Sequence, residues 1–145
     1  MSEKTISKAV KVITAKTGGG NEGHCVLALI DNEGFPTAST IAVSKADGIK
    51  ELAFCVELNG NKANRIKDCN RASVCFSTEE HNITLVGTIE VLTDPQIKKE
   101  MWYDGLQHIF TEGADDPNYC VLRFKTKRYN LFFSDEFDHA TGTLA

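Results

Sequence analysis

Short apolar stretches that alternate residue by residue and end at turn residues are the feature that most limits how this chain folds. The clearest is residues 83–92. Its buried face would carry Ile83, Leu85, Gly87, Ile89 and Val91. Successive side chains of a strand point to opposite faces of a sheet, so this alternation predicts a β-strand with one buried face. The glycine in the middle of the stretch indicates a bend or the close approach of another backbone.

Further stretches rich in β-branched, aromatic or small residues are also predicted as strands. They comprise residues 24–30, 37–43, 51–56, 73–77, 119–124 and 129–133. The first two flank the turn Asp31-Asn32-Glu33-Gly34 and should form a hairpin, and a second turn is expected at residues 45–48. Six or seven short strands in mostly local order, with few helices, predict a mainly β fold, an antiparallel barrel or sandwich.

Three helices are expected beside the strands. The N-terminal helix would cover residues 1–17, with Ser2 as its cap, and end at glycines 18–20. A short helix should open at Asn61, and a third at Asp94-Pro95, where Asp accepts amide hydrogens and Pro needs none. The expected inner positions are Ile6, Ala9, Val10 and Ile13, then Ala63, Ile66 and Cys69, then Ile97, Met101, Trp102 and Ile109. Residues 134–145 indicate an acidic, frayed C-terminal tail.

One domain spanning residues 1–145 is long enough to bury a core without disulfides or metals. Its five cysteines form no C-x-x-C pair and mostly lie in apolar stretches, so they are predicted to be reduced, structural and mostly buried. The net charge of −4, with no basic stripe, argues against a nucleic-acid partner. No apolar run approaches the roughly 20 residues of a membrane span, and no signal core follows the first residues. A cytoplasmic protein without a membrane partner is expected.

Several motifs resemble functional sites but do not predict one. Residues 18–23 match G-x-G-x-x-G, but the dinucleotide fingerprint needs a strand before it and a helix after it, the reverse of the order here. We interpret the segment as a flexible linker. The four histidines are scattered, which predicts no metal site, and no serine lies in a G-x-S-x-G elbow. The adjacent Asp115 and Asp116 are better explained by turn capping, so the catalytic residues are unknown.

The segment 54–65 is more informative, because a strand, a glycine-containing turn and a helix that opens at Asn61 and Lys62 follow one another there. A helix start presents free amide hydrogens and the positive end of its dipole, and a lysine adds a full charge. This arrangement suits a phosphate. The alternative is that Asn61 is an ordinary cap and Lys62 an ordinary surface lysine.

Four segments in this order resemble the flavin-binding core of the pyridoxamine phosphate oxidase-like family, most closely its small members, the general stress protein 26-like group. They are residues 34–40 (GFPTAST), 52–56 (LAFCV), 61–66 (NKANRI) and 74–76 (VCF). The resemblance spans nearly the whole chain, because residues 87–90 and 110–119 also look like family segments. It implies an FMN-binding split β-barrel whose cofactor lies at a homodimer interface.

The resemblance also implies a set of cofactor-binding residues. The strand with Ala38, Ser39, Thr40 and Ile41 and the strand with Phe54, Cys55 and Val56 would flank the isoalloxazine and ribityl chain. Asn61 and Lys62 would hold the phosphate, while Tyr129 and Phe132 would come from the second subunit. Two departures matter: Ser39 stands where many relatives carry a phosphate-contacting arginine, and the Arg-x-His element of the true oxidases is missing around residues 128–130. The chain is therefore not expected to be a true pyridoxamine phosphate oxidase.

Three functions remain open at this point. The first is a flavin-dependent oxidoreductase, in which the cofactor supplies the hydride or electron chemistry and no acid–base residue needs to stand out. The second is a non-enzymatic flavin carrier or stress-response protein. The third keeps the fold and exchanges the ligand for a deazaflavin or haem. The sequence does not identify a substrate or an electron donor.

Overall fold

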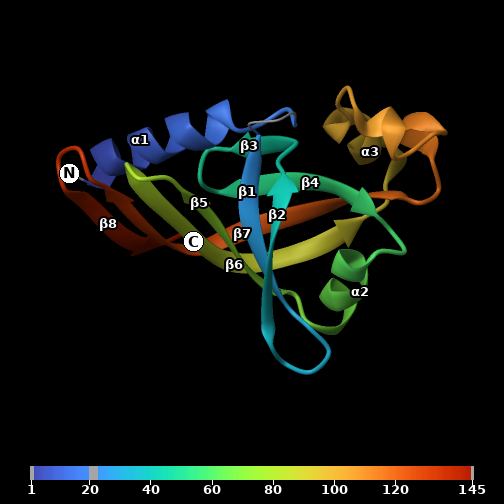
Figure 1. Ribbon diagram of the computed structural model, residues 1–145, viewed down its shortest axis with the longest axis horizontal. Helices are drawn as coiled ribbons and strands as arrows, with labels where there is room; N and C mark the ends of the chain where they lie inside the picture. Colours follow the sequence, from blue (N-terminus) through green and yellow to red (C-terminus); the bar gives the residue numbers. More distant parts are fainter. Residues whose placement is uncertain (1, 20–22, 145) are drawn as a thin grey trace.

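One curved antiparallel sheet forms most of the molecule, which confirms the predicted mainly β fold (Figure 1). The computed structural model of the protein describes residues 2–19 and 23–144. The strands are β1 (His24–Ile30), β2 (Pro36–Ala42), β3 (Lys45–Asp47), β4 (Glu51–Glu57), β5 (Arg71–Ser77), β6 (His81–Leu92), β7 (Tyr119–Phe133) and β8 (Asp138–Thr143). The helices are α1 (Ser2–Ala15), α2 (Asn61–Asp68) and α3 (Pro95–Met101), with the short 3₁₀ helices η1 (Leu106–His108) and η2 (Gly113–Asp115).

The strand order in the sheet is β2-β1-β5-β6-β7-β4-β3, and β8 pairs with β7 outside this path. The predicted β1–β2 hairpin is confirmed, with Ile30 opposite Pro36 and His24 opposite Ala42. The sheet curls into a half-barrel that brings β2 beside β4, although no ladder joins these two strands. α1 lies beside β8 at one end, and α2 and α3 lie at the other (Figure 1). The barrel is therefore split between β2 and β4.

β7 is a single long strand rather than the two short strands predicted. The polar residues 125–128 indicated a break, but β7 pairs with β6 from Val121 to Phe133, across a register shift between Val86 and Gly87. The close approach predicted at Gly87 is confirmed, because a β-carbon added there would lie 1.9 Å from the carbonyl oxygen of Lys125. A glycine at this position lets the two backbones meet.

The main core fills the curve of the sheet with fully buried Leu27, Phe54, Leu85, Leu122 and Phe124, among others. α1 closes one end of this core with two of its predicted inner residues, Ala9 and Ile13. A second cluster lies on the outer side of β4 and β7, beneath α3 and the two 3₁₀ helices. It contains Ala53, Leu106, Phe110, Tyr119 and Val121. The outer cluster forms one side of the site described below.

The frayed C-terminal tail predicted for residues 134–145 is wrong over most of that range. β8 pairs with the second half of β7, from Phe133 opposite Asp138 to Arg128 opposite Thr143. Its Ala140 is buried. The pairing partner, and not any apolar pattern within residues 138–143, makes this segment a strand.

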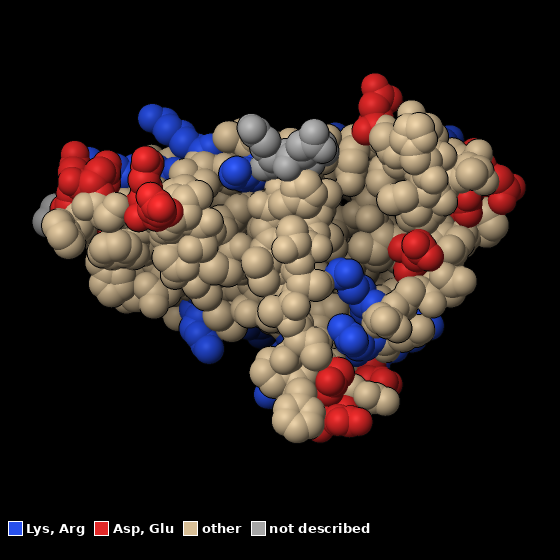
Figure 2. Space-filling model, in the orientation of Figure 1, with Lys and Arg blue, Asp and Glu red and all other residues tan. Residues whose placement is uncertain are grey.

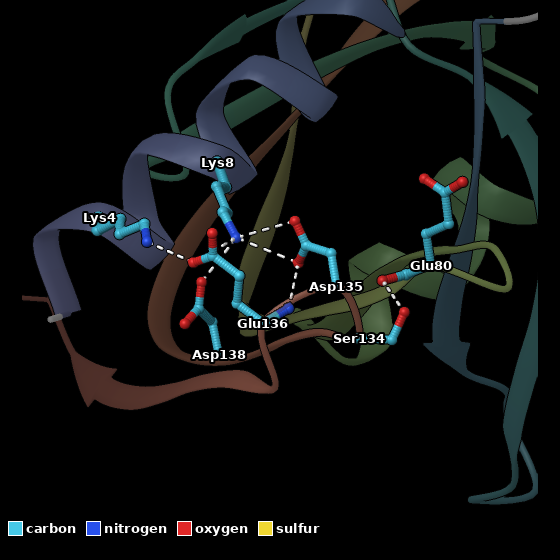
Figure 3. A network of polar contacts seen from close by, with 7 residues as sticks. All are labelled: Lys4, Lys8, Glu80, Ser134, Asp135, Glu136 and Asp138. Carbon is cyan, nitrogen blue, oxygen red and sulfur yellow. Dashed lines mark hydrogen bonds and ion pairs between the residues drawn. The ribbon is translucent and has the colours of Figure 1, made fainter.

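Charged contacts tie α1 to the β7–β8 turn (Figure 3). The Lys8 ammonium lies 2.6 Å from an Asp138 oxygen and 3.2 Å from both Asp135 oxygens, and Lys4 pairs with Glu136. On the same turn, the Ser134 hydroxyl donates to the carbonyl oxygen of Glu80. Hydrogen bonds from Lys8 raise its pKa and hold the pKa of Asp135 below its usual value. The N-terminal helix and the last strand are thus joined electrostatically.

Other local predictions need correction. α3 ends at Met101, so Ile109 is not an inner helical residue and its side chain is 59% exposed. Residues 45–47 form strand β3 rather than a turn; the reversal follows them, with the Lys50 amide donating to the Asp47 carbonyl. Cys69 lies just past the end of α2.

The cysteines are free, but fewer of them are buried than predicted. Cys25 and Cys120 are buried, whereas Cys55, Cys69 and Cys75 are half-buried. Residues 20–22, part of the predicted glycine linker, lie outside what the structure describes. The prediction that Ser2 caps the N-terminal helix is wrong, because Ser2 is itself the first residue of α1.

Neither a membrane-spanning helix nor a metal-binding cluster is present in the described residues. In residues 2–19 and 23–144, no helix is long and apolar enough to cross a membrane. No group of three or more His, Cys, Asp or Glu residues in the same ranges is arranged to hold a metal ion. The cytoplasmic location stays a prediction.

Candidate functional site

A cavity of about 440 Å³ opens between β2, β4, the start of α2 and residues 103–110. Figure 2 shows the surface hollowed between the ridge of β1 and β2 and the lobe that carries α3, with Lys and Arg side chains gathered over α2. The volume lies within the roughly 300–1,000 Å³ typical of small-molecule sites. The cavity lies where the barrel is split, so strand backbone, a helix start and a covering segment all border one space.

The beginning of α2 forms one wall, through Gly60, Asn61 and Lys62. Gly60 is the N-cap, and no side chain in the described ranges caps the helix. The first backbone bond of the helix runs from the Asn64 amide to the Gly60 carbonyl. The amide hydrogens before it carry the positive end of the helix dipole, and the half-buried Lys62 adds a full charge. This end of the cavity favours an anionic group.

The alternative in which Asn61 caps the helix is wrong, because Asn61 is itself the first helical residue. Gly60 takes the cap position in an extended conformation. Since glycine has no side chain to bond the first-turn amides, those amides stay available to a ligand.

The outer face of β4 forms the second wall and presents the thiol of Cys55. Its Sγ atom lies 3.3 Å from the carbonyl oxygen of Met101 and 3.4 Å from the Tyr119 hydroxyl. The single hydrogen of the Cys55 thiol is donated to the Met101 carbonyl, and the Tyr119 hydroxyl donates its own hydrogen to the Lys98 carbonyl at 2.7 Å. Burial raises the pKa of both Cys55 and Tyr119. Both groups are therefore neutral near neutral pH.

Residues 103–110 form the third wall, which is apolar. Leu106 and Phe110 are buried in the outer cluster, while Ile109 stands exposed at the rim. Tyr103 packs against the backbone of Gly19, where an added β-carbon would lie 2.1 Å from its ring. Burial raises the pKa of the Tyr103 hydroxyl. The wall offers a flat ligand the aromatic rings of Tyr103 and Phe110 and aliphatic contacts from Leu106 and Ile109.

The structure brings only part of the predicted site to this cavity. The predicted residues that line it are Thr40, Ile41, Cys55, Val56, Asn61 and Lys62. Ala38 and Ser39 are exposed on β2 outside the lining, and Phe54 is fully buried in the barrel core. Tyr129 and Phe132 lie in the second half of β7 and do not line it. Whether any of these residues contacts a cofactor stays a prediction.

Sequence reasoning missed the other lining residues, which are His24, Ala42, Glu57, Gly60, Tyr103, Leu106, Ile109 and Phe110. A signal existed for His24, since the predicted hairpin places it opposite Ala42. Gly60 could have been found from the Asn59-Gly60 turn before the predicted phosphate site. The segment 103–110 gave no periodic signal, because it forms a 3₁₀ helix and turns instead of one continuous helix.

Comparison with known families gives one match. Residues 20–137 match the sequence profile of the family described as "Pyridoxamine 5'-phosphate oxidase like". A comparison with curated proteins gives no match.

Solved structures share the fold. A protein from Clostridium acetobutylicum, related to general stress protein 26 of B. subtilis, has a TM-score of 0.82 at 23% identity, over 99% of this chain and 97% of that one. An FMN-binding, pyridoxamine 5'-phosphate oxidase-related protein from Nostoc punctiforme has a TM-score of 0.63 at 13% identity, over 99% and 94%. A haem-binding protein from Mycobacterium smegmatis has a TM-score of 0.68 at 18% identity, over 95% and 57%. At these identities the likeness concerns the fold.

Proposed function

The chain belongs to the pyridoxamine 5'-phosphate oxidase-like family, and on that premise we propose that it is an FMN-binding flavoprotein. The observation that carries the proposal is the cavity itself, which joins a cationic, uncapped helix start to an apolar and aromatic wall. FMN has matching parts: a phosphate at one end and a flat ring system at the other.

The residues of the cavity fit the two ends of FMN. Lys62 and the first amides of α2 would hold the phosphate. β2 stands at the end of the strand order, so one edge of its backbone has no ladder partner among the described strands. Small side chains at Ser39 and Thr40 would let a flat ring approach that edge, where amide groups hydrogen-bond flavin heteroatoms. Such contacts would orient the ring and tune its electronics.

We further propose that the protein acts as a flavin-dependent oxidoreductase. Bound FMN would supply the hydride or electron chemistry. The chain would bind the phosphate, hold the ring against β2 and β4, and exclude water through the wall at Tyr103 and Phe110. Without an Arg-x-His element near residues 128–130, we do not propose pyridoxamine phosphate oxidation.

A homodimer would complete the site. Phe132 is 36% exposed and contacts Phe137, which is 80% exposed, so apolar surface remains to be covered near the end of β7. In the proposed dimer, Tyr129 and Phe132 of a second copy reach the cofactor. A stable interface would bury about 1,200–2,000 Å² in total. Analytical ultracentrifugation at micromolar concentration tests it, and a flavin-bound monomer would contradict it.

Haem is the second candidate ligand, and it is favoured by the position of His24. His24 is among the residues that line the cavity, and histidine is a common axial ligand of haem iron. The visible spectrum of freshly purified protein decides between the two: a flavin absorption band supports FMN, and a Soret band supports haem. A deazaflavin would show its own shifted band.

Anaerobic addition of NADH or NADPH separates the enzyme from a non-enzymatic flavin carrier or stress-response protein. Repeated, turnover-linked loss of flavin colour supports the oxidoreductase. Flavin that stays oxidised with both donors supports the carrier.

A further inference from the structure

Asn118 makes two hydrogen bonds to the loop that leads from β4 to α2. The Leu58 amide donates to the Asn118 carbonyl oxygen at 2.7 Å, and the Asn59 amide donates to the Asn118 side-chain oxygen at 3.1 Å. Only Gly60 separates these two amides from Asn61, the first residue of α2. Asn118 thus contacts the loop immediately before the cationic end of the cavity.

Asn118 is itself held in place. One oxygen of the Asp116 carboxylate accepts from the Asn118 amide at 2.9 Å, and the other accepts from the Glu112 amide at 3.3 Å. The ammonium of Lys98, a buried residue of α3, donates to the Asp116 carbonyl oxygen at 3.0 Å. Its charge also lies 5.2 Å from the centre of the Tyr119 ring. A continuous set of polar contacts therefore runs from the buried side of α3, through residues 116–118, to the β4–α2 loop.

We propose that Asn118 is a positioning residue: it fixes the start of α2, which would bind the anionic end of the ligand. This proposal rests on the proposed binding of FMN. Binding a phosphate through amides and one lysine depends on direction, so a small rotation of the helix start weakens it. The loop before α2 has no side-chain cap of its own to fix that direction. Asn118 supplies the restraint from outside the loop. It acts through Leu58 and Asn59 and does not line the cavity.

The test is a comparison of FMN with riboflavin, which lacks the phosphate. Asn118→Ala removes the side-chain acceptor but leaves the carbonyl that binds Leu58. Loss of one such bond should weaken FMN binding roughly 3- to 10-fold, with riboflavin changed less than about twofold. The matched control is Asn70→Ala, at the other end of α2. The Asn70 carbonyl likewise accepts a backbone amide, that of Ile89.

Hydrogen exchange in the absence of any flavin tests positioning without the ligand. Asn118→Ala should speed exchange of the Asn59 amide, whereas Asn118→Asp, which keeps the acceptor, should restore the wild-type rate. Thermal unfolding midpoints of the variants show which of them are folded. If Asn118→Ala does not fold, Asn118→Ser, with a hydroxyl too short to reach the Asn59 amide, replaces it in both measurements.

The outcomes are distinct. A selective loss for FMN together with faster Asn59 exchange supports the proposal. Equal weakening of FMN and riboflavin overturns it, because the residue would then be merely structural, and so does an unchanged exchange rate. If wild-type protein binds neither flavin, the proposed function fails, and the positioning of the Asn59 loop is decided by exchange alone.

Discussion

Gly87 on β6 meets the backbone of Lys125 on β7 so closely that a β-carbon at Gly87 would lie 1.9 Å from the Lys125 carbonyl oxygen. The β6–β7 ladder shifts register at this point, between Val86 and Gly87. Because the obstacle is backbone, no side-chain rotation relieves it. The close pairing of β6 and β7 at this register shift therefore requires a residue without a β-carbon at position 87.

Gly87→Ala should destabilise the protein by at least about 2 kcal/mol, since the ladder must move apart to admit the methyl group. Urea unfolding measures the change. Gly142→Ala is the matched control: there the nearest atom is the hydroxyl of Tyr129, the end of a half-buried side chain that can swing aside. Equal losses for the two variants would show that the backbone contact is not the cause.

Lys62→Ala should weaken FMN binding roughly 10- to 100-fold, because a charge-assisted contact to the phosphate contributes on the order of 1.5–3 kcal/mol. Fluorescence titration measures it, and riboflavin affinity should hardly change. Lys67→Ala, which removes an exposed charge from the same helix, should have little effect. Unaltered FMN binding by the Lys62 variant would place the phosphate elsewhere.

The five cysteines should react with a thiol reagent in a defined order. Burial raises the pKa of Cys25 to about 12 and that of Cys120 to about 11, so these thiols hold almost no reactive thiolate near neutral pH. Half-buried Cys69 and Cys75 should be labelled first. Pulsed alkylation followed by peptide mass spectrometry gives the order. Rapid native labelling of Cys25 or Cys120 would refute it.

Cys55 gives a related test inside the cavity. Its thiol is half-buried and its pKa is raised by burial, so slow labelling is expected in the free protein. Saturating FMN should slow it further if the cofactor covers β4. Cys75 lies on β5 and does not line the cavity, so it serves as the internal control: its labelling should not respond to FMN.

The contacts of Lys8 should make the attachment of α1 sensitive to acid. Asp135 has a lowered folded-state pKa through its hydrogen bonds from Lys8, so its contribution is complete above the unfolded value, about 3.9. The contribution disappears as the pH falls through the lowered pKa. Lys8→Met should therefore be less stable than wild type near neutral pH, and the two should converge in strong acid. Circular dichroism during denaturation at several pH values measures this.

The control for that experiment is Lys11→Met, at an exposed lysine of the same helix. It changes the helix charge equally and should follow the wild type at every pH. A stability gap for Lys8→Met that persists unchanged in strong acid would mean that the cation–π contact of the Lys8 ammonium with the Phe133 ring, which does not depend on the carboxylates, is responsible.

The sequence predicted those elements whose own residues show a strand alternation or a turn motif. The alternation of residues 83–92 and the turn at Asp31-Asn32-Glu33-Gly34 correctly gave β6 and the first hairpin. β8 could not be predicted, because its order comes from pairing with β7 and it contributes a single buried side chain, Ala140. The continuity of β7 was hidden for the same reason: polar residues 125–128 stay extended only because β6 lies alongside.

The candidate site also has one part that the sequence predicted and one part that it did not. The sequence predicted the β4–α2 junction, because a turn glycine, Gly60, and a lysine, Lys62, lie two positions apart there. The apolar wall at Tyr103 and Phe110 was not predicted, because it depends on how irregular chain folds over the outside of β4 and β7. Burial of Lys98 was also invisible, since its partners, the Asp116 carbonyl and the Tyr119 ring, lie in a distant segment.

The strand order also determines when β4 can form its ladder during synthesis of the chain. β4 pairs with β3 and β7, so its longer ladder, from Glu57 opposite Tyr119 to Glu51 opposite Lys125, must wait until the ribosome has released β7. Until then one edge of β4, beside the residues that form the cavity, is open to pairing with other chains. The cavity is therefore completed only after β7 has emerged, and a polypeptide cut short before β7 can contain α2 and Lys62 without the cavity beside them.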